Sequence, residues 1–486
     1  MKRYIVFALV LLIGHTSFAQ SEMSAFTATG RAGAATTFVT DYQAIGINPA
    51  NLGWEGRNDK MISFSLLEGG YSVYSEALAK SDLAASFKKG NTKFTNDEKI
   101  LAAQEFTEAG FTANIDLSWL AIAVQPGEDV GGFAFSVRER FQWYSEFSEE
   151  LSEILFLGYN ADYFTHLILT TGDTILNSTN LPQDTAALIK KGYSIAAQLF
   201  SDIMGDSRLS LSWYREYNFS YGRRIMSNDD ISIYGGVGFK YLSGIAIMEA
   251  RVNDGSLEAY SAITPAFGIN YGDSAKTGNP STVESSSILP KSVGTGMGFD
   301  IGVSVIIGEK LKLGASLNDI GSITWDGNVY QANDDSLFDL TSGGFGSYNI
   351  FNEAQKVMGE EGMFDWSGVV ERKVKLPTNM RIGASFQPNE KFEVGLDMLI
   401  PVNDVAGSYG KPLMSFGMDI TPIPWLRLST GVSSGGNYGF NLPVGIVLMI
   451  NEGAWEIGVA SRDAITFFSE DRPTLSLSAG FLRFRF

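Results

Sequence analysis

The sequence has 486 residues and no cysteine, and its only histidines are His15 and His166. Without cysteine, the chain cannot form a disulfide scaffold, a thiolate metal site or a cysteine nucleophile. It also has no phosphate loop, zinc-protease motif or dinucleotide fingerprint. The acidic run near Asp326 and Asp334 has the wrong spacing for a calcium loop. We therefore expect a protein that is not an enzyme, with no catalytic residues, no metal and no cofactor.

Basic residues and long apolar runs are scarce as well. The chain has 36 Lys+Arg against 54 Asp+Glu, a net charge of −18. Such a chain has little with which to neutralise phosphates, so nucleic acid is not expected as a partner. No apolar run reaches eighteen residues, which argues against a helical membrane protein. A content of 44% hydrophobic residues and 53 glycines is nevertheless too apolar for a disordered chain.

The first residues have the pattern of a secretory signal peptide. Lys2 and Arg3 precede an apolar run over 4–13, and Ser17-Phe18-Ala19 forms a small-x-small cleavage site. We predict that residues 1–19 are removed and that the protein is exported. The choice is then between a soluble β-protein and a transmembrane barrel.

Strict alternation of side chains favours the barrel. In 391–401, for example, apolar residues alternate with Glu393, Gly395 and Asp397, a period of two that predicts half-buried strands. Charges on the polar side suit an ion-paired or water-filled lumen and are costly toward lipid. The expected lumen-facing charges, which we interpret as ion pairs that fill the lumen rather than as substrate guides, are Lys240, Asp300, Lys312, Arg381, Glu393, Asp397, Asp419, Arg427 and Glu456.

Short turns alternate with long loops, as in outer-membrane barrels. The long loops are expected at about 72–110, 145–208, 246–294 and 319–376. We predict an all-β membrane protein, an antiparallel transmembrane β-barrel of about 14 strands over 61–486 with partly helical extracellular loops. The predicted strands are 61–72, 111–125, 131–145, 209–224, 230–245, 295–307, 310–320, 377–388, 391–401, 412–421, 425–434, 441–450, 453–464 and 473–486. Residues 256–270 also resemble a strand, which we interpret as part of a hairpin above the membrane.

The last strand carries a further pattern. Leu482, Phe484 and the terminal Phe486 share one side, which resembles the signal read by the barrel assembly machinery. Residues upstream have the opposite parity, so a bulge is expected near Gly480. An aromatic girdle at the membrane interfaces is expected from Trp119, Trp143, Trp213, Trp325, Trp425 and Trp455.

The segment over 20–60 is rich in glycine and alanine before the first strand. It contains Gly30-Arg31-Ala32-Gly33 and Asn48-Pro49-Ala50-Asn51-Leu52. This opening resembles the FadL-type superfamily of long-chain fatty acid transporters, which includes the PorV-type proteins of the type IX secretion system. The resemblance implies a fourteen-stranded barrel with an N-terminal luminal hatch. The hatch and gate candidates are then Gly30, Arg31, Gly33, Asn48, Pro49, Ala50, Asn51 and Leu52.

Three functions remain open at this stage. The first is passive transport of a hydrophobic or amphipathic small molecule across the outer membrane of a Gram-negative bacterium. The second is a PorV-like partner barrel that docks a secreted protein, and the third is a plugged structural barrel. The long loops are acidic, which disfavours anionic fatty acids as cargo. Apolar stripes over 151–157 and 188–203 are expected to form small loop cores, with a ligand-capturing groove as the alternative. The expected partners are outer-membrane lipid, the barrel assembly machinery, and either a hydrophobic ligand or a secreted protein.

Overall fold

Fourteen antiparallel strands close into a barrel in the computed structural model of the chain. The structure describes residues 24–54, 60–75, 77, 94–127, 129–178, 181–278, 281–283, 290–347, 353, 359, 362–408, 411–469 and 474–486. The predicted signal peptide lies outside these residues. The predicted barrel is confirmed, and all fourteen strands lie where they were expected, although β8 continues eight residues beyond its predicted end.

The barrel strands follow one another around the wall, each paired with the next. They are β1 (Ile62–Ser75), β2 (Phe111–Val124), β3 (Gly132–Glu146), β7 (Arg208–Ser227), β8 (Ile231–Asn253), β10 (Gly294–Ile307), β11 (Leu311–Trp325), β16 (Asn379–Asn389), β17 (Phe392–Pro401), β18 (Leu413–Ile423), β19 (Leu426–Gly435), β21 (Val444–Ile450), β22 (Trp455–Ser461) and β23 (Thr474–Arg485). β23 pairs with β1 from Ser63↔Arg485 to Tyr74↔Thr474, which closes the ring. The first and last strands are thus paired with each other, as lipid requires.

Two local predictions about strands are also confirmed. β9 (Ser256–Ile263) pairs with the upper end of β8 and with β12 (Val329–Ala332), so it belongs to a hairpin above the membrane. In β23, Glu456 pairs with Arg483 but Gly458 pairs with Gly480, which is a bulge. Because of this bulge, the consecutive residues Phe481 and Leu482 are both exposed on the outside.

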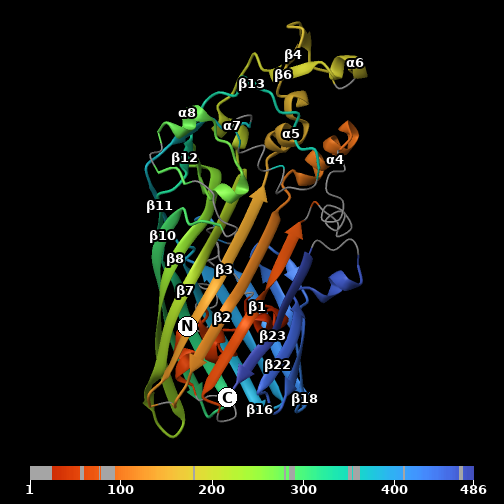
Figure 1. Cartoon of the computed structure of the whole chain (residues 1–486). Helices are drawn as coiled ribbons and strands as arrows, with labels where there is room; N and C mark the ends of the chain where they lie inside the picture. The colour runs from red at the N-terminus through yellow and green to blue at the C-terminus, as the bar shows by residue number, and fades with distance from the viewer. Residues whose placement is uncertain are drawn as a thin grey trace, which may run out of the picture.

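The long loops fold into a dome above the barrel (Figure 1). Its helices and strands include a four-stranded sheet in the order β13-β6-β4-β5. The elements outside the main wall are α4 (Asn96–Phe106), α5 (Glu149–Leu157), η4 (Gly158–Asn160), β4 (His166–Leu169), β5 (Thr174–Leu176), α6 (Gln183–Ala186), β6 (Ile189–Tyr193), α7 (Phe200–Met204), η5 (Pro265–Phe267), α8 (Asp273–Lys276), β13 (Asp339–Leu340), β14 (Trp366–Gly368), β15 (Arg372–Lys375), β20 (Phe440–Asn441) and η6 (Ala464–Phe467). None of the described helices is long and apolar enough to span a membrane.

The first apolar stripe forms part of the dome core. Leu151, Ile154 and Leu155 are buried, and next to them the ring of Phe156 lies 5.2 Å from that of Phe106. The second stripe divides: Phe200 and Ile203 are buried, whereas Leu188, Ile195 and Leu199 are exposed. The core encloses an apolar cavity of only about 30 Å³, far below the roughly 300–1,000 Å³ of a ligand pocket. The described dome therefore holds no preformed ligand groove there.

The expected tryptophan girdle is only partly correct. Trp119, Trp425 and Trp455 are exposed on the outside, but Trp143 and Trp325 are buried. Trp213 is half-buried, and its ring N–H donates to Glu139 at 2.8 Å. Trp325 lies beyond the membrane-crossing part of β11, and its ring occupies the space left by a glycine. A Cβ at Gly244 would lie 2.6 Å from that ring. Local packing at the barrel mouth therefore overrides the interfacial preference.

Candidate functional site

Residues 24–54 lie inside the barrel, where they form a hatch. The hatch contains α2 (Phe26–Gly30), η1 (Asp41–Ala44) and η2 (Pro49–Gly53), and almost all of its side chains are buried. In Figure 1 its red ribbon lies within the lower half of the barrel. The hatch is the strongest candidate for a functional site because it fills the lower lumen of the described barrel.

The hatch rests on a bed of glycines in the barrel wall. A Cβ at Gly236 would lie 2.3 Å from the carbonyl carbon of Pro49, and one at Gly132 would lie 2.2 Å from the carbonyl oxygen of Leu52. Real Cβ atoms do not approach this closely, so hatch backbone packs directly on wall backbone. Wall glycines whose added Cβ would come closer than 3.0 Å to hatch backbone are Gly132, Gly222, Gly236 and Gly417. Those whose added Cβ would come that close to a hatch side chain are Gly302, Gly383, Gly395, Gly458 and Gly480.

The Asn-Pro-Ala-Asn-Leu segment is a corner of the hatch. The side chain of Asn48 caps η2 by accepting from the Ala50 amide at 3.2 Å, and it donates to the carbonyl of Val303 at 3.1 Å. Pro49 takes the first helical position, which suits its fixed φ. Asn51 donates to the carbonyls of Thr36 and Val39. These residues hold the hatch in shape and attach it to β10.

The Gly-Arg-Ala-Gly segment contacts the opposite wall. The Nη1 of Arg31 lies 2.8 Å from Asp419, and both side chains are buried. Gly30 lies against Gly445, where a Cβ would come within 3.0 Å of the Gly445 Cα. Gly33 has φ of +90°, a conformation that favours glycine. Leu52, the last gate candidate, is fully buried, and its carbonyl accepts from Gln125.

Further carboxylates hold the hatch. Asp397 accepts from the amides of Ala35 and Thr36 at 2.8 and 3.0 Å. Asp41 of the hatch lies 3.0 Å from Arg483 and 2.8 Å from Arg485, both in the last strand. Neither Asp41 nor these two arginines was predicted as a site residue. The one indication in the sequence is that the two arginines alternate with the apolar residues at the end of the last strand.

Glu68 is another residue that the sequence did not indicate. The hydroxyl of Tyr42 donates to its carboxylate at 2.6 Å, and the side-chain amide of Gln43 donates to the same carboxylate at 2.7 Å. Glu68 follows Leu67, which has a positive φ of 53°. This irregular position interrupts the alternation of β1, so the parity pattern did not assign the side chain to the lumen.

A buried ion network fills the lumen at a second site. Lys240 lies 2.9 Å from Asp300 and also pairs with Asp319. Arg140 lies 3.0 Å from both Asp319 and Glu216. Lys240 and Asp300 were expected to face the lumen, whereas Arg140, Glu216 and Asp319 were missed. Opposite charges meet across strands that are far apart in sequence, so this part of the lumen is packed with ion pairs.

The other expected luminal charges also lie inside the barrel, in pairs. Lys312 and Glu393 are 2.9 Å apart. The pair Arg427–Glu456 is separated by 3.6 Å and the pair Arg381–Asp397 by 3.8 Å.

The loop between β17 and β18 closes the barrel mouth. The carboxylate of Asp404 lies 2.7 Å from Arg208 and 2.7 Å from Arg251, on β7 and β8. Ala406 is buried, and a Cβ at Gly407 would lie 2.7 Å from the side chain of Gln142. Residues 402–408 therefore reach the β3–β8 side of the mouth. This inward fold could not be predicted, because the loop is short and its residues are mostly small or polar.

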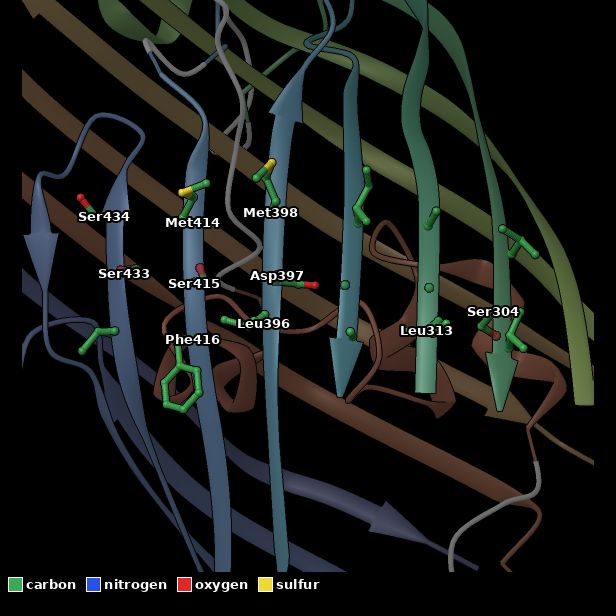
Figure 2. Close-up of a pocket in the computed structure, with 18 of the residues that line it drawn as sticks. Ser304, Leu313, Leu396, Asp397, Met398, Met414, Ser415, Phe416, Ser433 and Ser434 are labelled. Atoms are coloured by element: carbon green, nitrogen blue, oxygen red, sulfur yellow. The ribbon is translucent and has the colours of Figure 1, made fainter. Parts of the chain in front are cut away.

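The outer wall beside the hatch has an apolar hollow of about 700 Å³ (Figure 2). Its lining includes Leu396, Met414 and Phe416 on the neighbouring strands β17 and β18, all exposed on the outside. Behind it, Gly314 pairs with Gly383, and Gly383 pairs with Asp397. The wall is unbroken here, so a single layer of backbone separates the hollow from Thr36 of the hatch.

The residues of the proposed assembly signal lie at the lower end of β23. Leu482 and Phe486 are exposed on the outside of the barrel. The ring of Phe484 stacks against those of Trp455 and Phe486 at 6.0 and 6.5 Å. The three side chains thus form an aromatic and aliphatic strip on the lipid-facing surface.

Sequence and structure comparisons give distant relatives. A family model described as "Family of unknown function (DUF5723)" matches residues 154–452. Similar solved structures include the Pseudomonas putida toluene transporter TodX, with 10% identity over 97% of this chain and 98% of that chain and a TM-score of 0.40. A Pseudomonas aeruginosa FadL homologue has 11% identity over 96% and 97% and a TM-score of 0.43. The CymD monoaromatic hydrocarbon channel has 8% identity over 96% and 98% and a TM-score of 0.38. No match was found among curated proteins. Likeness at this level does not assign a substrate.

Proposed function

The chain belongs to DUF5723, a family of unknown function, and we propose from its geometry that it passively transports hydrophobic or amphipathic small molecules across the outer membrane of a Gram-negative bacterium. The observation that carries the proposal is the apolar hollow, which lies on the other side of the wall from the hatch. A pocket of this size and apolar lining suits an acyl chain or an aromatic hydrocarbon.

Passage requires the hatch to move. In the described residues the lumen is occupied by the hatch, by the Lys240 network and by the loop that carries Asp404. These layers contain buried charged and polar groups, which do not offer a favourable binding site to an apolar molecule. The hatch is held by hydrogen bonds and ion pairs, which break and re-form, and by packing on glycines. Displacing part of it is therefore the step on which transport depends.

The test is uptake into vesicles that carry lipopolysaccharide in the outer leaflet, because a plain phospholipid bilayer passes apolar molecules unaided. A fluorescent naphthylamine probe should enter vesicles that contain the protein faster than empty ones. Equal rates would remove the proposed function.

A cross-linked variant tests the hatch movement. A Cβ at Gly30 would lie 3.1 Å from the Cβ of Ser429, a few tenths of an ångström short of a disulfide's usual span. In the G30C/S429C double variant, oxidation should reduce uptake to the rate of empty vesicles, and reduction should restore it. Each single variant under the same oxidant is the matched control. Uptake that oxidation does not change would contradict movement of this part of the hatch.

A docking role is the second candidate, supported by the dome. Ile195 and Leu176 are 70% and 71% exposed, and Phe338 is 55% exposed. All three side chains lie on or beside the small dome sheet, and apolar side chains exposed on a folded surface can anchor a protein partner. A photoreactive residue at position 195 should then cross-link a secreted protein on living cells, whereas one at the exposed Asp184 should not. Docking without uptake would favour this role over transport.

A further inference from the structure

β22 is too short to cross a bilayer. It has seven residues, as does its neighbour β21, whereas its other neighbour β23 has twelve. A tilted transmembrane strand needs about 9–11 residues. Trp455 at the lower end of β22 is exposed, as expected for a side chain at the membrane interface. The β22–β23 ladder ends with Ala460↔Ser478, although β23 begins at Thr474. We call this missing part of the ladder, above Ser461, the notch; the chain continues past it in another conformation.

The chain that leaves this notch is firmly attached at its base. The guanidinium of Arg462 lies 3.9 Å from the ring centre of the buried Tyr438. Asp463 is buried and accepts from the amides of Leu442 and Ile465 at 3.3 and 3.4 Å. The amide of Ala464 donates to the carbonyl of Leu442 at 2.6 Å. This base fixes the direction in which the following turn, η6, leaves the wall.

The turn points away from the barrel and carries an exposed aromatic ring. In Figure 1 it is the blue turn that stands out beside the wall. Phe468 is 90% exposed, more than any other large apolar side chain in the described part of the chain. Burying such a side chain is worth about 1.5–3 kcal/mol. A position this exposed in water is therefore unfavourable.

The wall around the notch is part of the lipid-facing surface. Val459 on β22, Leu477 on β23 and Phe440 on β20 are all exposed on the outside. Leu477 also pairs with Tyr71 of β1, so this apolar surface continues across the seam of the barrel. The turn leaves the wall next to these residues. Because they face acyl chains, the turn lies at the same lipid-facing surface.

We infer that residues 464–469 insert into the outer leaflet and complete the apolar belt of the barrel where β22 ends. The partner is the acyl-chain region of the membrane, contacted by Phe468. The inference is independent of transport, because it concerns only the outside of the barrel.

The absence of cysteine makes the test direct, because any introduced cysteine is unique in the chain. A nitroxide label on the full-length F468C variant in phosphatidylcholine vesicles reports its collisions with oxygen, which concentrates among acyl chains, and with a water-soluble nickel complex. The matched controls are V459C, on the lipid-facing wall, and L176C, at the 71% exposed Leu176 of the dome. Gel mobility verifies that each variant is folded.

We expect the oxygen-to-nickel collision ratio at position 468 to equal that at 459 and to exceed that at 176 several-fold. A ratio like that at 176 would place the turn in water and overturn the inference. Protection from both reagents would also overturn it, because protein rather than lipid would then cover the ring.

Discussion

Single glycines decide how closely the hatch lies against the barrel. At Gly236, the nearest atoms to an added Cβ are the carbonyl carbon of Pro49 at 2.3 Å and the amide nitrogen of Ala50 at 2.4 Å. Both are backbone atoms, so no side chain can rotate away. The hatch or the strand must shift to make room.

The G236A variant should therefore be less stable by about 1–3 kcal/mol, the usual cost of overpacking. The measurement is urea unfolding in vesicles, followed by tryptophan fluorescence and gel mobility. The matched control is G110A, because the nearest atom to a Cβ at Gly110 is 3.9 Å away; its stability should change by less than about 0.5 kcal/mol. Equal stability of the two variants would mean that the hatch does not press on the wall as described.

At the scale of elements, α5 depends on a carboxyl in an unfavourable environment. Glu153 accepts from the amide of Asp162 at 2.7 Å. Burial raises the pKa of Glu153, and repulsion from Asp162, Glu149 and Glu150 adds to the increase. Folding of the dome therefore favours the protonated form. Its stabilising effect is present below the ordinary glutamate pKa and is lost as the pH rises through the raised value.

The protection of the α5 backbone amides from hydrogen exchange should therefore fall as the pH rises from about 4 to 7, after correction for the effect of pH on the intrinsic exchange rate. The E153Q variant keeps an acceptor for the Asp162 amide but cannot ionise, so its protection should fall less steeply. If the two slopes are the same, Glu153 does not control this part of the dome, and other carboxyls account for the dependence.

The elements also show how far the sequence alone could lead. One face of each strand meets lipid and the other meets the lumen, so alternation located all fourteen strands. β8 was predicted to end at residue 245 but continues to Asn253, because above the membrane it pairs with β9 and alternation is no longer required. The partners of buried charges could not be predicted. Asp41 meets Arg483 and Arg485 only because the ring closes, and nothing local in the sequence encodes that proximity.

For the whole molecule, the lumen is blocked at two heights along the barrel axis. The hatch fills the lower lumen, and the loop that carries Asp404 covers the mouth. In planar bilayers the intact protein should therefore carry no steady ionic current. D404A removes the contacts to Arg208 and Arg251 and should free the loop, yet the current should stay at zero because the hatch remains. Stable conductance steps in the unmodified protein would show that the lumen is open in a membrane.

The order of assembly follows from the way the two ends of the chain meet. Phe26 of the hatch lies against Gly458 and Gly480, and Asp41 is held by the final strand. A finished cylinder would leave no path for this segment to thread into place. The hatch must therefore already lie inside before β23 pairs with β1. Deleting this segment would therefore not give an open pore, because the strands would lose the surface against which they assemble.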